Sequence, residues 1–141
     1  MHPQTESLFI FGTNKGVLGF NDLRTSINAS NTILFKHEAD QSHFLSEIIN
    51  KYCDVSFIEG TRKIITRDLI SIKIWDICNN TKPLAHFNID EGIESNLCDL
   101  FESDCLEDKF GLTSIKNGSI LTGNYGDSFH IIEEDGNNIQ Y

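Results

Sequence analysis

Short runs of apolar residues alternate with polar turns along most of the chain. The first example is an apolar run at residues 8–11, a turn at 14–16, and a second apolar run at 17–20 that ends at Asn21-Asp22. Because strands have a two-residue period and Gly, Asn and Asp close short hairpins, this pattern predicts β-hairpins. The expected strands lie near residues 7–13, 17–22, 55–59, 63–67, 70–77, 112–115, 119–123 and 128–133.

The closing strands of three such sets form an internal repeat. The superposed segments are Leu18-x-Phe20-Asn21-Asp22, Ile72-x-Ile74-Trp75-Asp76 and Phe129-x-Ile131-Ile132-Glu133, with steps of 54 and 57 residues between their acids. This period exceeds the roughly 40–45 residues of a WD-repeat blade. The repeat therefore predicts an all-β fold, a partial WD-repeat β-propeller of about two to three blades, with surface insertions between them.

The spacing of the repeats predicts where each blade begins and ends. The expected divisions are the end of one blade at 1–36, an insertion at 37–52, a full blade at 53–89, an acidic insertion at 90–108, and most of the next blade at 109–141. Residues 44–49 have apolar positions at i, i+1, i+4 and i+5, which predicts a short amphipathic helix in the first insertion. The second insertion fits a helix or an ordered loop less clearly.

Four residues of the central repeat have the spacing of a structural polar network. Thr66, Asp68 and Trp75-Asp76 are placed as in a blade that links a strand hydroxyl, a turn carboxylate and an indole N–H. Such a network satisfies buried polar groups and fixes strand register. The histidine that usually joins it has no convincing counterpart, since His43 lies inside the expected insertion.

Composition and charge narrow the function. The chain has 19 Ile and 10 Phe against 3 Ala, which favours strands. Its net charge of −10 argues against nucleic acid as a partner and favours basic proteins. No apolar run approaches the roughly 20 residues of a membrane span, and the first residues do not resemble a signal peptide. We expect no membrane association and a cytoplasmic or nuclear location.

The sequence offers little support for an enzyme. The four cysteines, Cys53, Cys78, Cys98 and Cys105, have no C-x-x-C pair, so free thiols are favoured over disulfides or a metal site. The five histidines lack paired metal-ligand spacing, and no phosphate-binding or dinucleotide-binding glycine motif occurs. We expect no catalytic residues, no metal and no cofactor.

Several ordered blocks resemble the WD-repeat regulatory B subunits (B/PR55 class) of protein phosphatase 2A. The blocks are Phe44-Leu45-Ser46-Glu47-Ile48-Ile49, Asp54-Val55-Ser56-Phe57, Thr66-Arg67-Asp68, Ile72-Lys73-Ile74-Trp75-Asp76, and Leu97-Cys98 through Glu102-Ser103-Asp104-Cys105 to Asp108-Lys109-Phe110. They follow one another as in the family and cover nearly the whole chain, and several lie in the family's own insertions rather than in its blade strands. The resemblance is therefore to this family in particular, in a divergent form aligned with the later-middle part of its propeller.

The resemblance implies a non-catalytic regulatory subunit, or a fragment of one. Its implied partners are the phosphatase scaffold and catalytic subunits and basic segments of phosphoprotein substrates. The family's propeller has seven blades, so we expect this chain to be a piece of that ring and to be marginally stable alone, with apolar blade faces uncovered. The alternative is a WD-repeat interaction fragment that has no association with the phosphatase.

The acidic insertion is the candidate binding segment. Residues 90–108 contain eight acids and no Lys or Arg. Composition alone favours a solvated acidic loop, whereas the resemblance implies a substrate-binding surface. The residues that the resemblance implicates are Cys98, Phe101, Glu102, Asp104, Glu107 and Lys109. The family has tyrosine where Phe101 stands and phenylalanine where Glu107 stands, so substrate choice is expected to differ.

Overall fold

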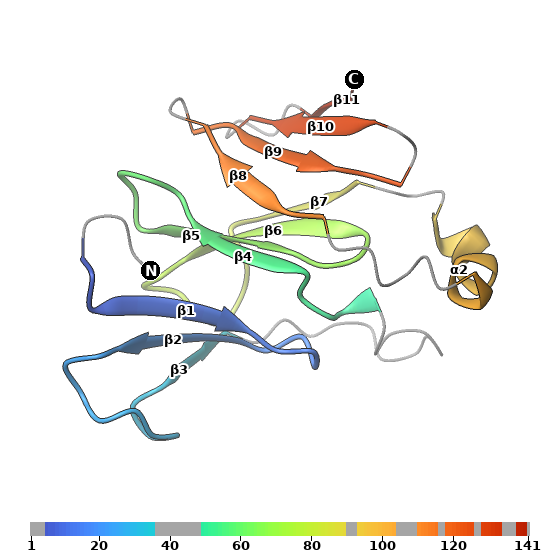
Figure 1. Cartoon of the computed structure of the whole chain (residues 1–141). Helices are drawn as coiled ribbons and strands as arrows, with labels where there is room; N and C mark the ends of the chain where they lie inside the picture. The colour runs from blue at the N-terminus through green and yellow to red at the C-terminus, as the bar shows by residue number, and fades with distance from the viewer. Residues whose placement is uncertain are drawn as a thin grey trace.

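The computed structural model describes residues 5–35, 49–89, 93–103, 110–115, 118–125, 128–133 and 138–140. Over these residues the chain forms three antiparallel sheets and the helix α2 (Ile93–Glu102), as Figure 1 shows. The first sheet contains β1 (Leu8–Gly12), β2 (Leu18–Asp22) and β3 (Ile33–Phe35). The middle sheet contains β4 (Asp54–Phe57), β5 (Lys63–Arg67), β6 (Ser71–Asp76) and β7 (Ala85–Asn88). The last sheet contains β8 (Leu112–Ser114), β9 (Ile120–Gly123), β10 (Phe129–Ile132) and β11 (Asn138–Gln140).

The three sheets lie in a row, with the middle sheet between the other two (Figure 1). Within each sheet, strands that follow one another in the chain pair antiparallel. Strand contacts between sheets join β1 to β4, β4 to β8 and β5 to β8, so the first strand of each sheet lies nearest its neighbours. Sheets that approach through their first strands and contain successive hairpins are the blades of a propeller. The fold is therefore an all-β, partial β-propeller.

The middle sheet has one face turned toward the first sheet and one turned toward the last. In all three sheets we call the face that points in the direction from the last sheet to the first the backward face, and the other the forward face. The forward face of the first sheet carries Leu18, Phe20 and Phe35, which form one core cluster with the backward face of the middle sheet. The backward face of the middle sheet contributes Phe57, Ile64 and Trp75. Edge-to-face ring pairs cross this interface, with centroids 6.5 Å apart for Phe20 and Phe57 and 5.7 Å apart for Phe35 and Trp75.

A second core cluster joins the middle sheet to the last sheet. The forward face of the middle sheet supplies Ile65, Ile72 and Ile74, and the backward face of the last sheet supplies Ile120 and Ile132. Both faces of the middle sheet are thus buried, which explains why β5 and β6 have apolar residues at consecutive positions, Ile64-Ile65 and Ile74-Trp75. The middle sheet is the centre of the core.

The structure confirms the eight strands expected from the sequence and adds three. The additional strands are β3, β7 and β11, the final strand of each sheet. Each has only three or four residues, and its place in the sheet comes from pairing with the preceding strand rather than from a run of apolar residues. In the acidic insertion, for which the sequence left a helix or an ordered loop open, the structure forms the helix α2. The helix expected at 44–49 lies outside the described residues except for Ile49.

The structure corrects one feature of the insertions, which were expected to lie on the surface. Tyr52, in the first insertion, packs against the core between the first and middle sheets. In the second insertion, Ile93 and Leu97 are buried. The described ends of both insertions therefore take part in the core.

The buried hydrogen bond of the Trp75 indole predicts that Thr66→Val lowers the stability of the fold. The indole N–H donates to the Thr66 hydroxyl at 3.1 Å, and both residues are buried. Valine keeps the shape of threonine but leaves that N–H unpaired, which should lower the free energy of unfolding by about 1–3 kcal/mol. Chemical denaturation followed by circular dichroism measures this loss. Thr113→Val, at an exposed strand position, is the control and should change it by less than about 0.5 kcal/mol. Equal losses for the two variants would contradict the assignment.

Candidate partner-binding surface

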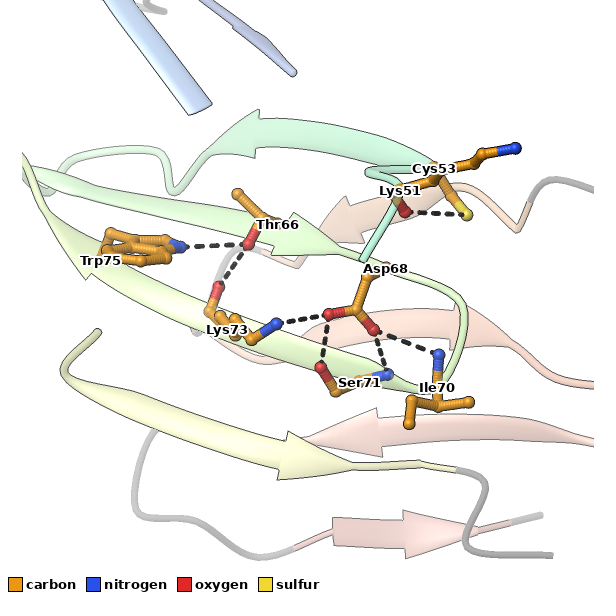
Figure 2. A network of polar contacts seen from close by, with 8 residues as sticks. All are labelled: Lys51, Cys53, Thr66, Asp68, Ile70, Ser71, Lys73 and Trp75. Atoms are coloured by element: carbon orange, nitrogen blue, oxygen red, sulfur yellow. Dashed lines mark hydrogen bonds and ion pairs between the residues drawn. The ribbon is translucent and has the colours of Figure 1, made fainter. Parts of the chain in front are cut away.

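The polar network of the middle sheet holds the turn on which the candidate surface rests (Figure 2). Thr66 accepts a hydrogen bond from the Trp75 indole and donates one to the Lys73 carbonyl at 3.4 Å. These contacts join β5 to β6 in the register that places Ile64 opposite Trp75. The network therefore fixes where the β5–β6 turn projects.

Asp68 organises that turn. Its carboxylate accepts hydrogen bonds from the backbone N–H groups of Ile70 and Ser71 and from the Ser71 hydroxyl. It also forms an ion pair with the Lys73 ammonium at 2.5 Å, with both side chains buried. A buried carboxylate that has four hydrogen-bond partners, one of them cationic, is compensated for its loss of water.

Asp76 has a different place from the one the spacing suggested. Its carboxylate accepts a hydrogen bond from the Cys78 backbone N–H at 2.9 Å and so shapes the turn after β6. That turn lies at the end of β6 opposite to Asp68, since Asp76 pairs in register with Lys63 at the start of β5. The structure therefore assigns Asp76 to this turn and not to the network of Thr66 and Asp68.

Tyr52 lies beside Thr66 and Asp68, the residues with which the usual histidine of such a network would interact. It is partly buried beside Thr66, with which it forms a side-chain hydrogen bond, and near the Asp68 carboxylate. Burial, followed by the negative charge of Asp68, raises the pKa of the Tyr52 phenol well above its usual value, while the hydrogen bond with Thr66 lowers it by less. Sequence reasoning missed this residue because it searched for an imidazole.

The last sheet repeats the network with different side chains. Asn124 follows β9 as Asp68 follows β5, and His130 stands in β10 where Lys73 stands in β6. The Asn124 amide and the His130 imidazole lie 2.9 Å apart and are both buried. The same two positions therefore hold a carboxylate and an ammonium group in one sheet and an amide and an imidazole in the next.

Helix α2 docks on the β5–β6 turn through one apolar face. Ile93, Leu97 and Leu100, at i, i+4 and i+7, pack with Leu69 and Ile70 of the turn. Tyr125, from the turn between β9 and β10, belongs to the same cluster. The helix thus spans the edges of the middle and last sheets.

The opposite face of α2 is acidic, and an exposed aromatic ring borders the apolar face, four residues after Leu97. Asn96, Asp99 and Glu102 are exposed, and Phe101 is 58% exposed. Asp99 and Glu102 are three residues apart, so they lie on the same side of the helix. The exposed residues of α2 are therefore two carboxylates on one side and, at the border with the apolar face, an aromatic ring; we call them together the α2 surface: Asp99, Phe101 and Glu102.

The negative charges of the α2 surface do not stabilise the helix. Both carboxylates lie in its last turn, where the helix dipole favours cations, and this turn contains no basic residue. An anion at this end costs a helix about a few tenths of a kcal/mol or more. Since Asp99 and Glu102 do not stabilise this end of the helix, their presence is better explained by an interaction with another molecule.

The described residues on either side of 104–109 are packed against the sheets. On one side α2 is anchored by Leu97, which is fully buried. On the other side the Phe110 ring lies 4.7 Å from the Tyr125 ring, edge to face, with the Arg67 guanidinium 5.5 Å from the Phe110 centroid. Both flanks of residues 104–109 are therefore attached near the same edge of the sheets.

The structure describes only part of the expected site. It places the side chains of Phe101 and Glu102 on the α2 surface. Cys98 lies in α2, but its side chain is outside the described part of the chain, as are Asp104, Glu107 and Lys109. Sequence reasoning counted Asp99 only as one acid of eight. Its spacing from Glu102 was the available signal.

The described residues contain neither a metal site nor a membrane span. No group of three or more His, Cys, Asp or Glu side chains among them is arranged to hold a metal ion. None of the helical segments found there has the length and apolar character to cross a bilayer.

Comparisons with known proteins identify what the chain is similar to. It is 36% identical over 138 residues to the serine/threonine-protein phosphatase 2A regulatory subunit phr2AB of Dictyostelium discoideum, covering 95% of this chain and 29% of that protein. It is 35% identical over 140 residues to the B beta isoform of the phosphatase 2A 55 kDa regulatory subunit from Carassius auratus, covering 95% of this chain and 31% of that protein. No family model matches the chain.

The chain is similar, in divergent form, to one segment of the 55 kDa regulatory B subunits of phosphatase 2A. It spans about 30% of the length of these curated relatives. The resemblance seen in the sequence blocks is therefore confirmed.

Solved structures agree on the fold. Raptor of Chaetomium thermophilum superposes with a TM-score of 0.65 at 18% identity, covering 98% of this chain and 11% of that one. The WD40 repeats of RRP9 superpose with a TM-score of 0.62 at 10% identity, covering 96% of this chain and 33% of that one. At these identities the likeness shows WD-repeat blades and nothing of function.

The two forms of the network predict how the middle sheet tolerates substitution. Lys73→Met removes one partner of a buried ion pair and should lower the free energy of unfolding by about 3–5 kcal/mol. The double variant Asp68→Asn, Lys73→His copies the amide–imidazole pair of the last sheet and should lose less stability than the single variant. Thermal and chemical unfolding measure both changes. A double variant less stable than Lys73→Met would contradict the equivalence of the two positions.

Tyr52 predicts a loss of stability at alkaline pH. The pKa of the Tyr52 phenol is higher in the folded chain than in the unfolded chain, where a tyrosine has a pKa of about 10. The folded state therefore keeps a proton that the unfolded state loses, and this contribution to stability, complete below pH about 10, is lost as the pH rises further. Tyr52→Phe should remove it, so the stability difference between the two chains should shift toward the variant above pH about 10. If the difference in the free energy of unfolding between the two chains stays constant from pH about 8 to about 11, this effect is excluded.

Proposed function

We propose that this chain acts as a non-catalytic regulatory subunit of serine/threonine-protein phosphatase 2A, or as part of one. The observation that carries the proposal is 36% identity across 95% of the chain to a protein that is itself named a regulatory subunit of that phosphatase. The partners would then be the scaffold and catalytic subunits, and the location would be cytoplasmic or nuclear.

The α2 surface supports a more specific proposal, the recruitment of basic segments of phosphoprotein substrates. Asp99 and Glu102 supply negative charge, and Phe101 supplies an exposed ring for apolar contact. The net charge of −10 attracts basic segments at longer range and speeds their encounter. The family resemblance also implicates Asp104, Glu107, Lys109 and Cys98, whose side chains lie outside the described part of the chain.

A second candidate is a WD-repeat interaction fragment that binds proteins without the phosphatase. It is supported by the share of the relatives that the chain covers, about 30%. Capture with purified scaffold and catalytic subunits separates the two. Retention of both subunits supports the regulatory role, whereas a chain that retains neither subunit but still binds basic peptides supports the alternative.

Substitutions on the α2 surface should weaken the binding of a basic peptide. An exposed ion pair contributes roughly 0.2–1 kcal/mol, so Glu102→Lys should reduce affinity severalfold, and Asp99→Lys with Glu102→Lys should reduce it further. Phe101→Ala should cost about 1–2 kcal/mol, because the exposed ring is available as an anchor. A fluorescence titration with a labelled Lys/Arg-rich peptide at two salt concentrations measures these changes.

The matched control is Glu59→Lys. Glu59 is an exposed acid in the turn between β4 and β5, at the end of β5 opposite to the turn that carries α2. It changes net charge by the same amount, so it should alter affinity little if contact with the α2 surface is required. Equal effects of Glu59→Lys and Glu102→Lys would reduce the role of α2 to general attraction by the acidic chain. Affinity that is unchanged in every variant and at both salt concentrations would leave α2 a solvated acidic helix.

A further inference from the structure

The edge of the sheets that carries the α2 surface also carries two exposed lysines. Lys15 lies in the turn between β1 and β2, and Lys51 lies in the connection that leads into β4. Figure 1 shows this turn, this connection and α2 at the same edge of the molecule. Both lysines therefore lie where we expect substrates to bind, and not on the outer face of the first or last sheet.

A close backbone contact brings the two lysines together. A Cβ atom on Gly16 would come within 2.7 Å of the Asn50 carbonyl oxygen. Gly16 has a φ of 69°, which glycine adopts without strain, so the turn can approach Asn50 this closely. Lys15 and Lys51 each adjoin one member of this contact. Because a lysine carries its ammonium group on a flexible four-carbon stem, the two groups can reach the same anion.

Both ammonium groups are available to another molecule. Neither Lys15 nor Lys51 forms an ion pair with any residue that the structure describes. By contrast, Arg24 is exposed at the opposite edge and is bound by the Asp22 carboxylate at 2.6 Å. The chain has 21 acids against 11 Lys and Arg, so carboxylates are abundant. Two neighbouring cations without a carboxylate are therefore a distinct feature of this edge.

Charge is thus divided along the edge. The part that belongs to the first sheet is cationic at Lys15 and Lys51, whereas α2, over the middle and last sheets, is acidic at Asp99 and Glu102. The two parts are joined, since Ile49 packs in the apolar cluster that holds α2 on the β5–β6 turn. A peptide that lies along this edge meets a basic site and an acidic site in turn.

We propose that Lys15 and Lys51 together bind a phosphoryl group on the same substrate segment whose basic residues bind the α2 surface. This inference rests on the substrate recruitment proposed above. A phosphoserine has a charge of about −1.5 to −2 at neutral pH, which two ammonium groups balance. The phosphoryl group held here is distinct from the one that the catalytic subunit would remove. It serves recognition, so the preferred substrates carry a second phosphorylated residue.

The architecture sets the spacing of the two kinds of charge in such a substrate. Facing sheets lie about 10 Å apart, and an extended peptide advances about 3.3 Å per residue. The lysines lie at the edge of the first sheet and α2 spans the edges of the middle and last sheets, so one to two sheet spacings separate them. The phosphoryl group should therefore lie about three to six residues from the basic cluster.

A fluorescence titration with paired peptides tests the inference. One labelled Lys/Arg-rich peptide carries phosphoserine about five residues from its basic cluster, and the other carries serine there. The phosphoserine form should bind the chain about two- to tenfold more tightly, since each exposed ion pair contributes modestly. The net charge of −10 repels phosphate, so general attraction cannot produce this gain. A phosphoserine placed directly beside the basic cluster should lose it.

Matched double variants locate the gain. Lys15→Gln with Lys51→Gln should abolish it without weakening the binding of the serine peptide. Arg62→Gln with Lys82→Gln is the control, because it removes the same charge from two exposed positions at the opposite edge and should retain the gain. Circular dichroism verifies that each variant is folded. A wild-type chain without the gain, a gain that persists in the Lys15, Lys51 variant, or an equal loss in the control would overturn the inference and leave the recruitment of basic segments intact.

Failure of the serine peptide to bind would instead contradict that recruitment. The lysine pair is then tested by itself, with nuclear magnetic resonance and a phosphoserine peptide that contains no Lys or Arg. Shifts of the Lys15 and Lys51 amide signals, with those of Arg62 and Lys82 unmoved, would support the phosphoryl site. Signals of Lys15 and Lys51 that do not respond would overturn it.

Discussion

The enclosure of Trp75 between two sheets is the constraint on which the rest of the fold depends. An indole can be fully buried at low cost only if its N–H has a partner, and Thr66 on the neighbouring strand supplies one. This bond requires the register in which Ile64 lies opposite Trp75. The same register turns Trp75 toward Phe35 of the first sheet, so one polar contact within a sheet also determines how two sheets meet.

The consequences of this register extend to the candidate surface. Asp68 follows β5 and holds the turn into β6 by accepting bonds from Ser71 and Lys73. That turn presents Leu69 to the apolar face of α2. Since one side of α2 is occupied by this packing, its acidic side is directed outward. The exposure of Glu102 thus follows, through the turn and the helix, from how the middle sheet is assembled.

The sequence predicted what local pattern determines. Alternation and turn residues located eight strands, and the repeat placed Trp75 at a buried position. The final strand of each sheet was missed, because a segment such as Ala85–Asn88 becomes a strand through pairing with β6 rather than through its own residues. The role of Tyr52 was missed for a related reason: its contacts with Thr66 and Asp68 join residues that are separated along the chain. Of the site expected from the family resemblance, the structure describes the side chains of Phe101 and Glu102, and it adds Asp99 through helical spacing.

Quenching of the single tryptophan by acrylamide tests the central claim most directly. Trp75 is the chain's only tryptophan, so its emission reports on one site, the interface between the first and middle sheets. The account predicts a blue-shifted emission and a quenching constant several times lower in the native chain than in the chain unfolded by denaturant. It also predicts that Thr66→Val makes the indole more accessible. A native chain in which acrylamide quenches Trp75 as strongly as in the unfolded chain would contradict the assembly of the sheets described above.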